Sequence, residues 1–363
     1  MRLADLPTPA LILDRQVLQR NLAAMQDRAR LLGVRLRPHL KTAKSAEVAR
    51  LALGPGRDGI TVSTLSEARY FLAKGFRDLT YAIAITPDKF AEVARLLRAG
   101  AELTIITDDI PTARALGAYG KSQGLTIPVL IEIDTGQGRG GLVPEEPTLV
   151  PLGEILHRSG GTSLQGVLTH AGHSYRCRSL GEIAAVAEIE RAGAVAAADR
   201  LRGAGLPCPV VSVGSTPTAL QAEHLAGVSE IRPGVYMFMD LFQASLGLCQ
   251  PADIAVSVLT AVIGHKSKQA RLLVDAGALA LSQDQSRPGF GRVQGLPLHV
   301  AEVNQEHGFI AADTAEDLPP QPVGTRLRIL PNHSCMTAAM HGQYHVVDGS
   351  DTVLAVWERC RGW

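Results

Sequence analysis

Short apolar runs alternate with amphipathic stretches along the first two thirds of the chain. The runs cover residues 34–37, 60–63, 79–83, 102–106, 128–133, 164–169, 209–213 and 229–231, and they predict eight strands. Between the strands, residues 14–33 place Leu18, Leu22 and Met25 on one face, with Gly33 where a helix is expected to stop. Eight strand and helix units in this length predict an α/β fold, a TIM (β/α)8 barrel.

After about Asp240, helical patterns become rare and strand-like runs follow one another. These runs cover residues 254–262, 270–275, 298–303, 325–330, 344–347 and 352–356. The change in pattern predicts two domains, an N-terminal barrel over residues 1–243 and a C-terminal, mostly β domain over residues 244–363.

The composition narrows the classes of partner. Lysine and arginine number 36 against 35 aspartates and glutamates, and a net charge of +1 does not favour nucleic acid. The N-terminus lacks a signal-peptide pattern, and no apolar run approaches membrane-spanning length. Five scattered cysteines, an odd number, argue against a disulfide framework. We therefore expect a cytoplasmic protein, not bound to a membrane, that acts on a small molecule.

A basic segment follows the first predicted strand, with the sequence Arg37-Pro38-His39-Leu40-Lys41-Thr42-Ala43-Lys44. A lysine amine forms an imine with an aldehyde only when it is unprotonated, which burial or neighbouring positive charge favours. Arg37, His39 and Lys44 could provide such surroundings for Lys41. A basic run after a strand is also typical of a solvated loop, so this segment alone leaves both interpretations open.

Other polar residues follow later strands of the predicted barrel, and barrels collect their chemistry at the carboxyl ends of their strands. Arg139 follows the fifth strand, and His170 and Tyr175 follow the sixth. Residues 214–218 and 232–236 follow the seventh and eighth strands, where barrels commonly hold a phosphate. With Lys41, these loops predict a site for a phosphorylated aldehyde cofactor, although residues 214–218 can also be an ordinary turn.

A candidate metal site lies in Leu330-Pro331-Asn332-His333-Ser334-Cys335. If this segment continues a strand, His333 and Cys335 point to the same face. A histidine nitrogen with a thiolate suits zinc, and a site with few protein ligands keeps positions open for water or substrate. The alternative is a buried cysteine beside a hydrogen-bonded histidine, which is common in protein cores.

Together these segments resemble the pyridoxal-phosphate enzymes of the alanine racemase type (fold type III), and among them the D-serine dehydratase and D-threonine aldolase family. The resemblance extends over nearly the whole chain, with ordered matches at residues 8–11, 37–42, 134–139, 214–218, 232–236, 306–308 and 331–335. It implies pyridoxal 5'-phosphate as cofactor, a divalent metal ion (zinc before manganese or magnesium) and a homodimer.

The resemblance also implies roles for individual residues. Lys41 would hold the cofactor covalently and then act as the base at the substrate Cα. Arg139 would hydrogen-bond the cofactor's phenolic oxygen, while His170 and Tyr175 would line its ring. Arg232 would lie beside the pyridine nitrogen, although relatives vary at this position. The phosphate would be received by Gly214, Ser215, Thr216, Gly234 and Val235.

A metal ion distinguishes the lyases of this group from the racemases, because it assists departure of a β-hydroxyl. Its ligands would be His333 and Cys335, and the cysteine resembles the dehydratases more than the aldolases. We therefore expect dehydration of a D-3-hydroxy amino acid to a 2-oxo acid and ammonia, with D-serine as first candidate and D-threonine and D-threo-3-hydroxyaspartate close behind.

Three other functions stay open. A D-threonine aldolase would use the same cofactor and metal to release glycine and an aldehyde. An amino-acid racemase is less favoured, because it needs a second base and Tyr344 is the only tyrosine after Tyr236. A non-catalytic carrier of the cofactor is also less favoured, because such carriers lack the β domain.

Overall fold

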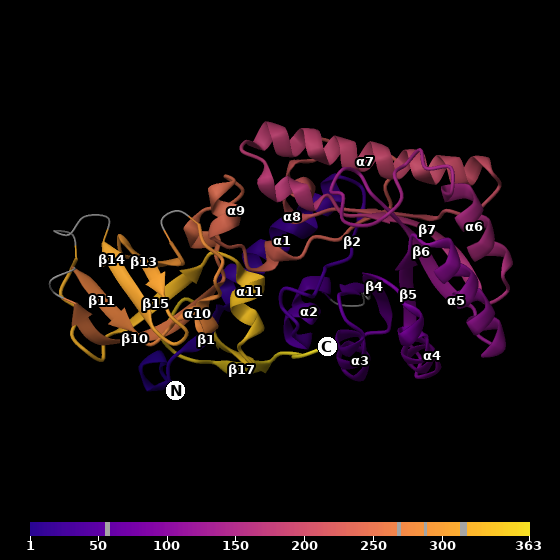
Figure 1. Cartoon of the computed structure of the whole chain (residues 1–363). Coiled ribbons are helices and arrows are strands. Elements are labelled where there is room, and N and C mark those ends of the chain that lie inside the picture. The colour runs from indigo at the N-terminus through magenta and orange to yellow at the C-terminus, as the bar shows by residue number, and fades with distance from the viewer. Residues whose placement is uncertain (55–58, 267–269, 287–288, 313–317) are drawn as a thin grey trace. The chain divides into compact units, whose positions relative to one another are not determined.

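Parallel strands build one unit of the chain, and mostly antiparallel strands build the other (Figure 1). The computed structural model describes residues 1–54, 59–266, 270–286, 289–312 and 318–363. The β unit contains Met1–Ala23, Thr42–Val48 and Val235–Arg361, and the barrel unit contains Ala24–Lys41, Ala49–Gly234 and Gly362–Trp363. Each unit therefore combines distant stretches of sequence, and the division at residues 243 and 244 stays a prediction.

The eight strands of the barrel unit coincide with the eight predicted runs. Their order is β2-β9-β8-β7-β6-β5-β4-β3, and every pair is parallel. A bridge between His39 and Thr61 joins the two edges of this sheet, which confirms the predicted TIM barrel. The strands are β2 (Arg35–Leu36), β3 (Ile60–Val62), β4 (Asp78–Ala84), β5 (Glu102–Thr107), β6 (Ile127–Ile133), β7 (Thr162–Thr169), β8 (Val210–Val213) and β9 (Glu230–Ile231).

Helices follow the strands and lie around them in Figure 1. Several begin at a side chain that accepts a backbone hydrogen bond, such as Thr64 from the amide of Glu67 and Asp109 from the amide of Thr112. The helices are α1 (Arg15–Leu31), α2 (Ala46–Leu53), α3 (Leu65–Ala73), α4 (Phe90–Arg98), α5 (Ile110–Ser122), α6 (Leu149–Arg158), α7 (Leu180–Gly203) and α8 (Thr216–Gln221). The chain passes between the units within α1 and within α2.

The β unit holds a nine-stranded sheet, in which β10 also pairs with β11 and so closes a ring of six strands. All pairs are antiparallel except β1 with β16. The strands are β1 (Ala10–Asp14), β10 (Val256–Lys266), β11 (Arg271–Val274), β12 (Gly291–Val293), β13 (Leu298–Val303), β14 (Gly308–Ala312), β15 (Arg326–Pro331), β16 (Gln343–Val347) and β17 (Ala355–Glu358). The predicted β domain is confirmed, although β1, β12 and β14 were not predicted.

Short helices complete the β unit, and a buried tyrosine holds the segment after Lys41. They are α9 (Leu241–Ser245), α10 (Ala278–Leu281) and α11 (Ser334–Ala339). Tyr344 of β16 is fully buried, packs edge to face on Phe238, and donates its hydroxyl to the carbonyl of Ala43 at 2.7 Å. The segment after Lys41 is thus fixed within the β unit. Among the described residues, no helix combines the length and the apolar character needed to cross a bilayer.

Candidate functional site

Lys41 stands just beyond the end of the first barrel strand. After β2, the chain keeps pairing with β3, since the amide of Thr61 donates to the carbonyl of Pro38 at 2.9 Å and the amide of Leu40 to the carbonyl of Thr61 at 2.8 Å. Lys41 follows at once and is exposed. The parallel pairing therefore directs this lysine to the carboxyl-end rim, where a barrel places its chemistry.

Arg37 does not provide an unbalanced positive charge near Lys41. Its guanidinium donates to both oxygens of Asp78 at 2.7 and 2.8 Å and to Glu230 at 3.0 Å. Burial opposes ionisation of Glu230, but Arg37 and Arg35 outweigh it and lower the glutamate pKa to about 2. The buried arginine is thus compensated by carboxylates, and other groups must set the environment of Lys41.

Two imidazoles and two guanidinium groups act electrostatically on one another around Lys41. Burial, followed by the charges of Lys41, Arg139 and Arg232, lowers the pKa of His170 to about 3. Burial and the same lysine also lower the pKa of His39 well below its usual value. Both rings are therefore uncharged at neutral pH. The structure brings together four of the predicted residues, namely Lys41, Arg139, His170 and Arg232.

Arg232 is buried inside the barrel and ties the ends of two strands together. It donates to the hydroxyl of Ser212 at 2.6 Å and to the carbonyl of Thr169 at 2.5 Å. Burial lowers its pKa to about 10. Its hydrogen bonds to β7 and β8 give it a structural function in addition to the cofactor contact predicted for it.

The loop that carries Arg139 is organised by Asp134 at the end of β6. The Asp134 carboxylate accepts hydrogen bonds from the amides of Gly136, Gln137 and Gly138 at 2.8 to 3.1 Å. Gly136 and Gly138 both have positive φ, which glycine adopts without strain. The side chain of Arg139 is 54% exposed and lies 3.9 Å from Glu132. Arg139 directly follows Gly138, and its side chain is directed toward solvent.

The loop after β8 depends on a residue that the sequence analysis missed. One oxygen of the buried Glu190 accepts the amides of Ala171 at 2.8 Å and Gly214 at 3.1 Å, and burial raises the pKa of this carboxyl. Glu190 thereby fixes the loops after β7 and β8 together. Its signal in the sequence is a charged residue in register with the apolar stripe of Ile183 and Ala187.

The predicted phosphate residues are mostly buried, and several of their polar groups are engaged. Ser215 caps α8, accepting the amide of Thr218, and its hydroxyl lies 2.9 Å from that of Ser174. The amide of Ser215 donates to the hydroxyl of Thr218 at 2.9 Å. Thr216, Gly234 and Val235 are buried, whereas Tyr175 is 40% exposed. The amides of Gly214 and Ser215 and the Ser215 hydroxyl therefore all have partners within the protein.

His333 and Cys335 do not lie on a strand, so the expectation that a strand aligns them is wrong. Strand β15 ends at Pro331, His333 is the residue that precedes α11, and Cys335 lies in its first turn. The break follows from Asn332, whose buried side chain donates to the carbonyls of Asp284 and Gly289 at 2.8 and 2.6 Å. The helical start nevertheless brings the two side chains together, since they hydrogen-bond to each other.

Polar neighbours surround this pair. The carboxylate of Asp284, which the sequence analysis missed, lies 2.7 Å from Nδ1 of His333. The thiol of Cys335 lies 3.2 Å from the hydroxyl of Thr42, the residue directly after Lys41. Although burial opposes it, the hydrogen bond with Cys335 and the negative charges of Cys335 and Asp240 raise the pKa of His333 to about 9. This site therefore favours a positive charge.

The donor set of His333 and Cys335 fits a zinc ion. Zinc accepts imidazole nitrogen and thiolate sulfur, and two protein ligands leave positions for substrate or water. Over the described ranges, no cluster of three or more histidine, cysteine, aspartate or glutamate side chains is arranged to hold a metal. The pair would thus supply two protein ligands to such an ion.

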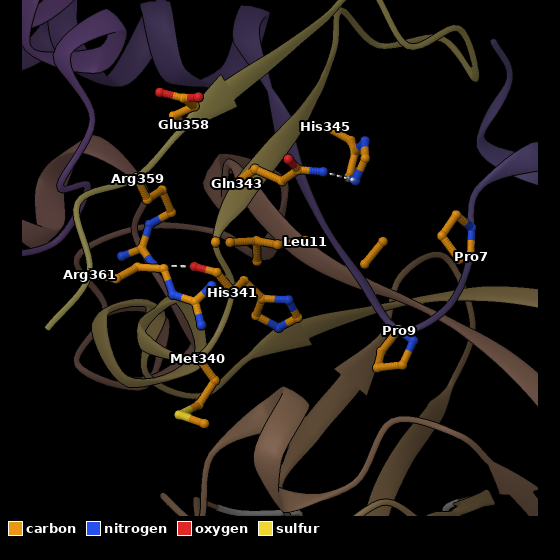
Figure 2. A pocket seen from close by; sticks show the side chains of 12 residues that line it. Pro7, Pro9, Leu11, Met340, His341, Gln343, His345, Glu358, Arg359 and Arg361 are labelled. Atoms are coloured by element: carbon orange, nitrogen blue, oxygen red, sulfur yellow. Dashed lines mark hydrogen bonds between the residues drawn. The ribbon is translucent and has the colours of Figure 1, made fainter.

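A pocket of about 630 Å³ lies elsewhere in the β unit, beside β1, β16 and β17 (Figure 2). Its lining includes His341, Gln343, His345, Arg359 and Arg361. Arg359 donates to the carbonyl of His341 at 2.9 Å, and Gln343 lies 3.4 Å from the ring of His345, as Figure 2 shows. None of the predicted site residues is among the described residues that line this pocket.

Two family models match successive parts of the chain. Residues 13–241 match the family model described as alanine racemase, N-terminal domain, and residues 255–347 match the putative serine dehydratase domain. The chain is 46% identical to D-threo-3-hydroxyaspartate dehydratase of Delftia sp. (strain HT23), over 99% of both chains. It is 31% identical to D-serine dehydratase of Dictyostelium discoideum, over 99% and 98%, and 30% identical to D-threonine aldolase of Arthrobacter sp, over 98% and 93%.

Solved structures agree with these matches. The structure of D-threo-3-hydroxyaspartate dehydratase from Delftia sp. HT23 superposes with a TM-score of 0.95 at 45% identity, over 100% of both chains. Two further structures of this dehydratase carry alanine in place of a histidine and of a cysteine two positions apart, and the cysteine variant is described as metal-free. His333 and Cys335 have the same spacing.

Proposed function

Since this chain belongs to the D-serine dehydratase and D-threonine aldolase family of alanine-racemase-type proteins, we propose that it is a pyridoxal-phosphate- and zinc-dependent lyase of D-3-hydroxy amino acids. Its favoured reaction is dehydration to a 2-oxo acid and ammonia. The membership confirms the predicted family and the predicted lyase class, because the similar relatives are named as dehydratases and aldolases.

One observation carries the proposal of a lyase that uses a cofactor and a metal together. The thiol of Cys335, hydrogen-bonded to His333, lies 3.2 Å from the hydroxyl of Thr42, whose neighbour in the chain is Lys41. A single peptide bond thus connects the proposed cofactor lysine with a residue that contacts the proposed metal ligand. This arrangement supports one reaction that uses both groups.

The groups around Lys41 fit an anionic, aromatic aldehyde. An amine, the guanidinium groups of Arg139 and Arg232, and two uncharged imidazoles are grouped together, and the Ser215 hydroxyl is buried nearby in the loop after β8. We propose that Lys41 Nζ holds pyridoxal 5'-phosphate, with Arg139 at its phenolic oxygen, His170 and Tyr175 along its ring and Arg232 by the pyridine nitrogen. The proposed phosphate contacts are Gly214, Ser215, Thr216, Gly234 and Val235.

When bound, the cofactor would withdraw electrons from the substrate Cα, and zinc on His333 and Cys335 would act as a Lewis acid toward the β-hydroxyl. The residues of the chain then have separate roles in the reaction. Lys41 Nζ removes the proton from Cα once the substrate has taken its place on the cofactor. His39 and His170 remain uncharged in these surroundings, so they add no further positive charge beside Lys41. The released enamine hydrolyses to the 2-oxo acid and ammonia.

The favoured substrates are D-threo-3-hydroxyaspartate and D-serine, the substrates in the names of two similar relatives. The higher identity, 46% against 31%, favours the first. The test is to incubate the cofactor-loaded protein with each substrate, with D-threonine and with L-serine as a control, and to quantify all products. Equal amounts of 2-oxo acid and ammonia from a D-3-hydroxy amino acid are expected. Racemisation alone would contradict the proposal.

The second candidate is an aldolase, favoured by the 30% identity with a D-threonine aldolase. The same experiment separates the two reactions, because retro-aldol cleavage of D-threonine yields glycine and an aldehyde without ammonia. We also propose a homodimer, as the resemblance implies, and sedimentation analysis of the loaded protein tests it. A monomer at micromolar concentration would contradict this second proposal.

A further inference from the structure

We propose that Asp284 is a positioning residue of the metal site, which orients the imidazole of His333 so that its Nε2 faces the metal. This inference rests on the proposed function, because it assumes that His333 is a zinc ligand. Metal-binding histidines generally donate their other ring N–H to a carboxylate or a carbonyl, which fixes the tautomer and raises the basicity of the ligating nitrogen.

The geometry matches this arrangement. Asp284 Oδ2 lies 2.7 Å from His333 Nδ1, the separation of a charge-assisted hydrogen bond. A nitrogen and an oxygen bound to one tetrahedral zinc at about 2.1 Å each would lie roughly 3.4 Å apart. The observed contact is too short to hold a zinc ion between these two atoms. Asp284 is therefore placed to support His333 and not to replace it as a ligand through Nδ1.

Asp284 is itself held in place by the residue that precedes His333. The buried Asn332 donates to the carbonyl of Asp284 at 2.8 Å and accepts the hydroxyl of Ser286 at 2.7 Å. The Asp284 amide donates to the hydroxyl of Ser282 at 3.2 Å. The side chain of Asn332 thus fixes the loop that carries Asp284. Because Asn332 directly precedes His333, it also fixes the backbone next to the imidazole.

The imidazole also lies next to an aromatic ring. Phe242 of α9 lies 5.9 Å from His333 between ring centroids, at an angle of 53°. With Nδ1 directed to Asp284, the ring has one nitrogen left for a metal. Cys335 has a comparable neighbour in Thr42, whose hydroxyl lies 3.2 Å from its sulfur. Both proposed ligands are therefore oriented by hydrogen bonds from other segments of the chain.

The test measures zinc affinity of the cofactor-loaded protein in competition with a chromophoric chelator. Replacement of Asp284 by alanine is expected to weaken zinc binding about 10- to 100-fold. Asp284→Asn, which keeps a neutral acceptor, is expected to weaken it less. Asp348→Ala is the matched control, because Asp348 lies in the same unit with a side chain 33% exposed, against 36% for Asp284. This control is expected to keep wild-type affinity.

A second readout separates support from direct ligation. Cobalt(II) substituted for zinc reports the thiolate through its charge-transfer absorption, and X-ray absorption counts the nitrogen and oxygen ligands. Both are expected to be the same in Asp284→Ala as in the wild type once metal is saturating. Loss of one oxygen ligand in the variant would overturn the inference by making Asp284 a ligand.

Two other outcomes are distinguishable. Wild-type zinc affinity in Asp284→Ala, with the metal-free variant as stable to heat as the wild type, would overturn the role of Asp284 alone. A wild-type protein that binds no zinc and yields no 2-oxo acid would overturn the proposed function on which the inference rests.

Discussion

His170 in the barrel unit and His333 in the β unit are both partly buried imidazoles, yet their pKa values are shifted in opposite directions. Burial and the cations Lys41, Arg139 and Arg232 lower the pKa of His170 to about 3. Against the effect of burial, Cys335 and Asp240 raise the pKa of His333 to about 9. The surroundings of His170 thus disfavour a charged ring, and those of His333 favour one. The difference supports the proposal that the two units contribute separate chemical functions.

Removing the amine of Lys41 from the site in the barrel unit is expected to have the largest effect. Lys41→Ala should lower turnover more than about a thousandfold, because the proposed cofactor bond and the proposed base are lost together. Absorbance of bound pyridoxal phosphate and product formation measure the two losses. Lys121→Ala, an exposed lysine of α5 in the same unit, is the control and should retain both. Full turnover in the Lys41 variant would refute the assignment.

Breaking the proposed metal site at His333 and Cys335 is expected to have the next largest effect. Cys335→Ala removes the proposed thiolate ligand and should weaken zinc binding by about a hundredfold or more, with a matching loss of 2-oxo acid. Cofactor absorbance should persist, because Lys41 is untouched. Zinc content after dialysis, compared with that of Cys177→Ala, checks the result. If the Cys335 variant kept its zinc, the metal would have to lie elsewhere.

A smaller effect is expected when Glu190, which fixes the loops after β7 and β8, loses its carboxylate. Glu190→Leu leaves the amides of Ala171 and Gly214 without their acceptor and should cost about 2 kcal/mol of unfolding free energy. Glu190→Gln keeps an oxygen in that place and should cost less. Urea denaturation of the two variants measures the difference. Equal stability of the leucine variant and the wild type would mean that both amides find other acceptors.

The sequence pattern predicted the barrel more completely than the β unit. The eight barrel strands are local apolar runs with helices between them, so periodicity detects each one. Strand β1 was missed because its partners, β10 and β16, come from the other end of the chain, and its apolar run leads directly into α1. Strands β12 and β14 are short and contain Gly291 and Gly308, which weakens a strand pattern.

The chemistry at the site was predicted by residue type rather than by geometry. Lys41, Arg139, His170 and Arg232 lie together because parallel strands bring their carboxyl ends to one rim. The pair His333 and Cys335 was placed on a strand, whereas hydrogen bonds of Asn332 end β15 and start α11. Asp284 was missed because it acts through a contact with a distant part of the chain. Glu190 was missed although its register with the apolar stripe of α7 was visible in the sequence.

A pH measurement sharpens the contrast between the two imidazoles. The pKa of His170 is lower in the folded chain, about 3, than the usual 6.5, so the unfolded chain binds more protons between these values. Its stabilising contribution is present above about pH 6.5 and declines as pH falls, by at most about 1.4 kcal/mol per pH unit. Urea denaturation of the cofactor-free protein should show a shallower pH dependence in His170→Gln. An unchanged slope would mean that folding does not lower the pKa of His170.

The most direct test of a cofactor in the barrel unit and a metal in the β unit is chelation of the loaded enzyme. The protein would be treated with a zinc chelator, and cofactor absorbance and 2-oxo acid formation from D-threo-3-hydroxyaspartate would be followed in the same sample. We predict that absorbance persists, that 2-oxo acid formation stops, and that added zinc restores it. Undiminished dehydration by the metal-free protein would contradict the proposed role of His333 and Cys335.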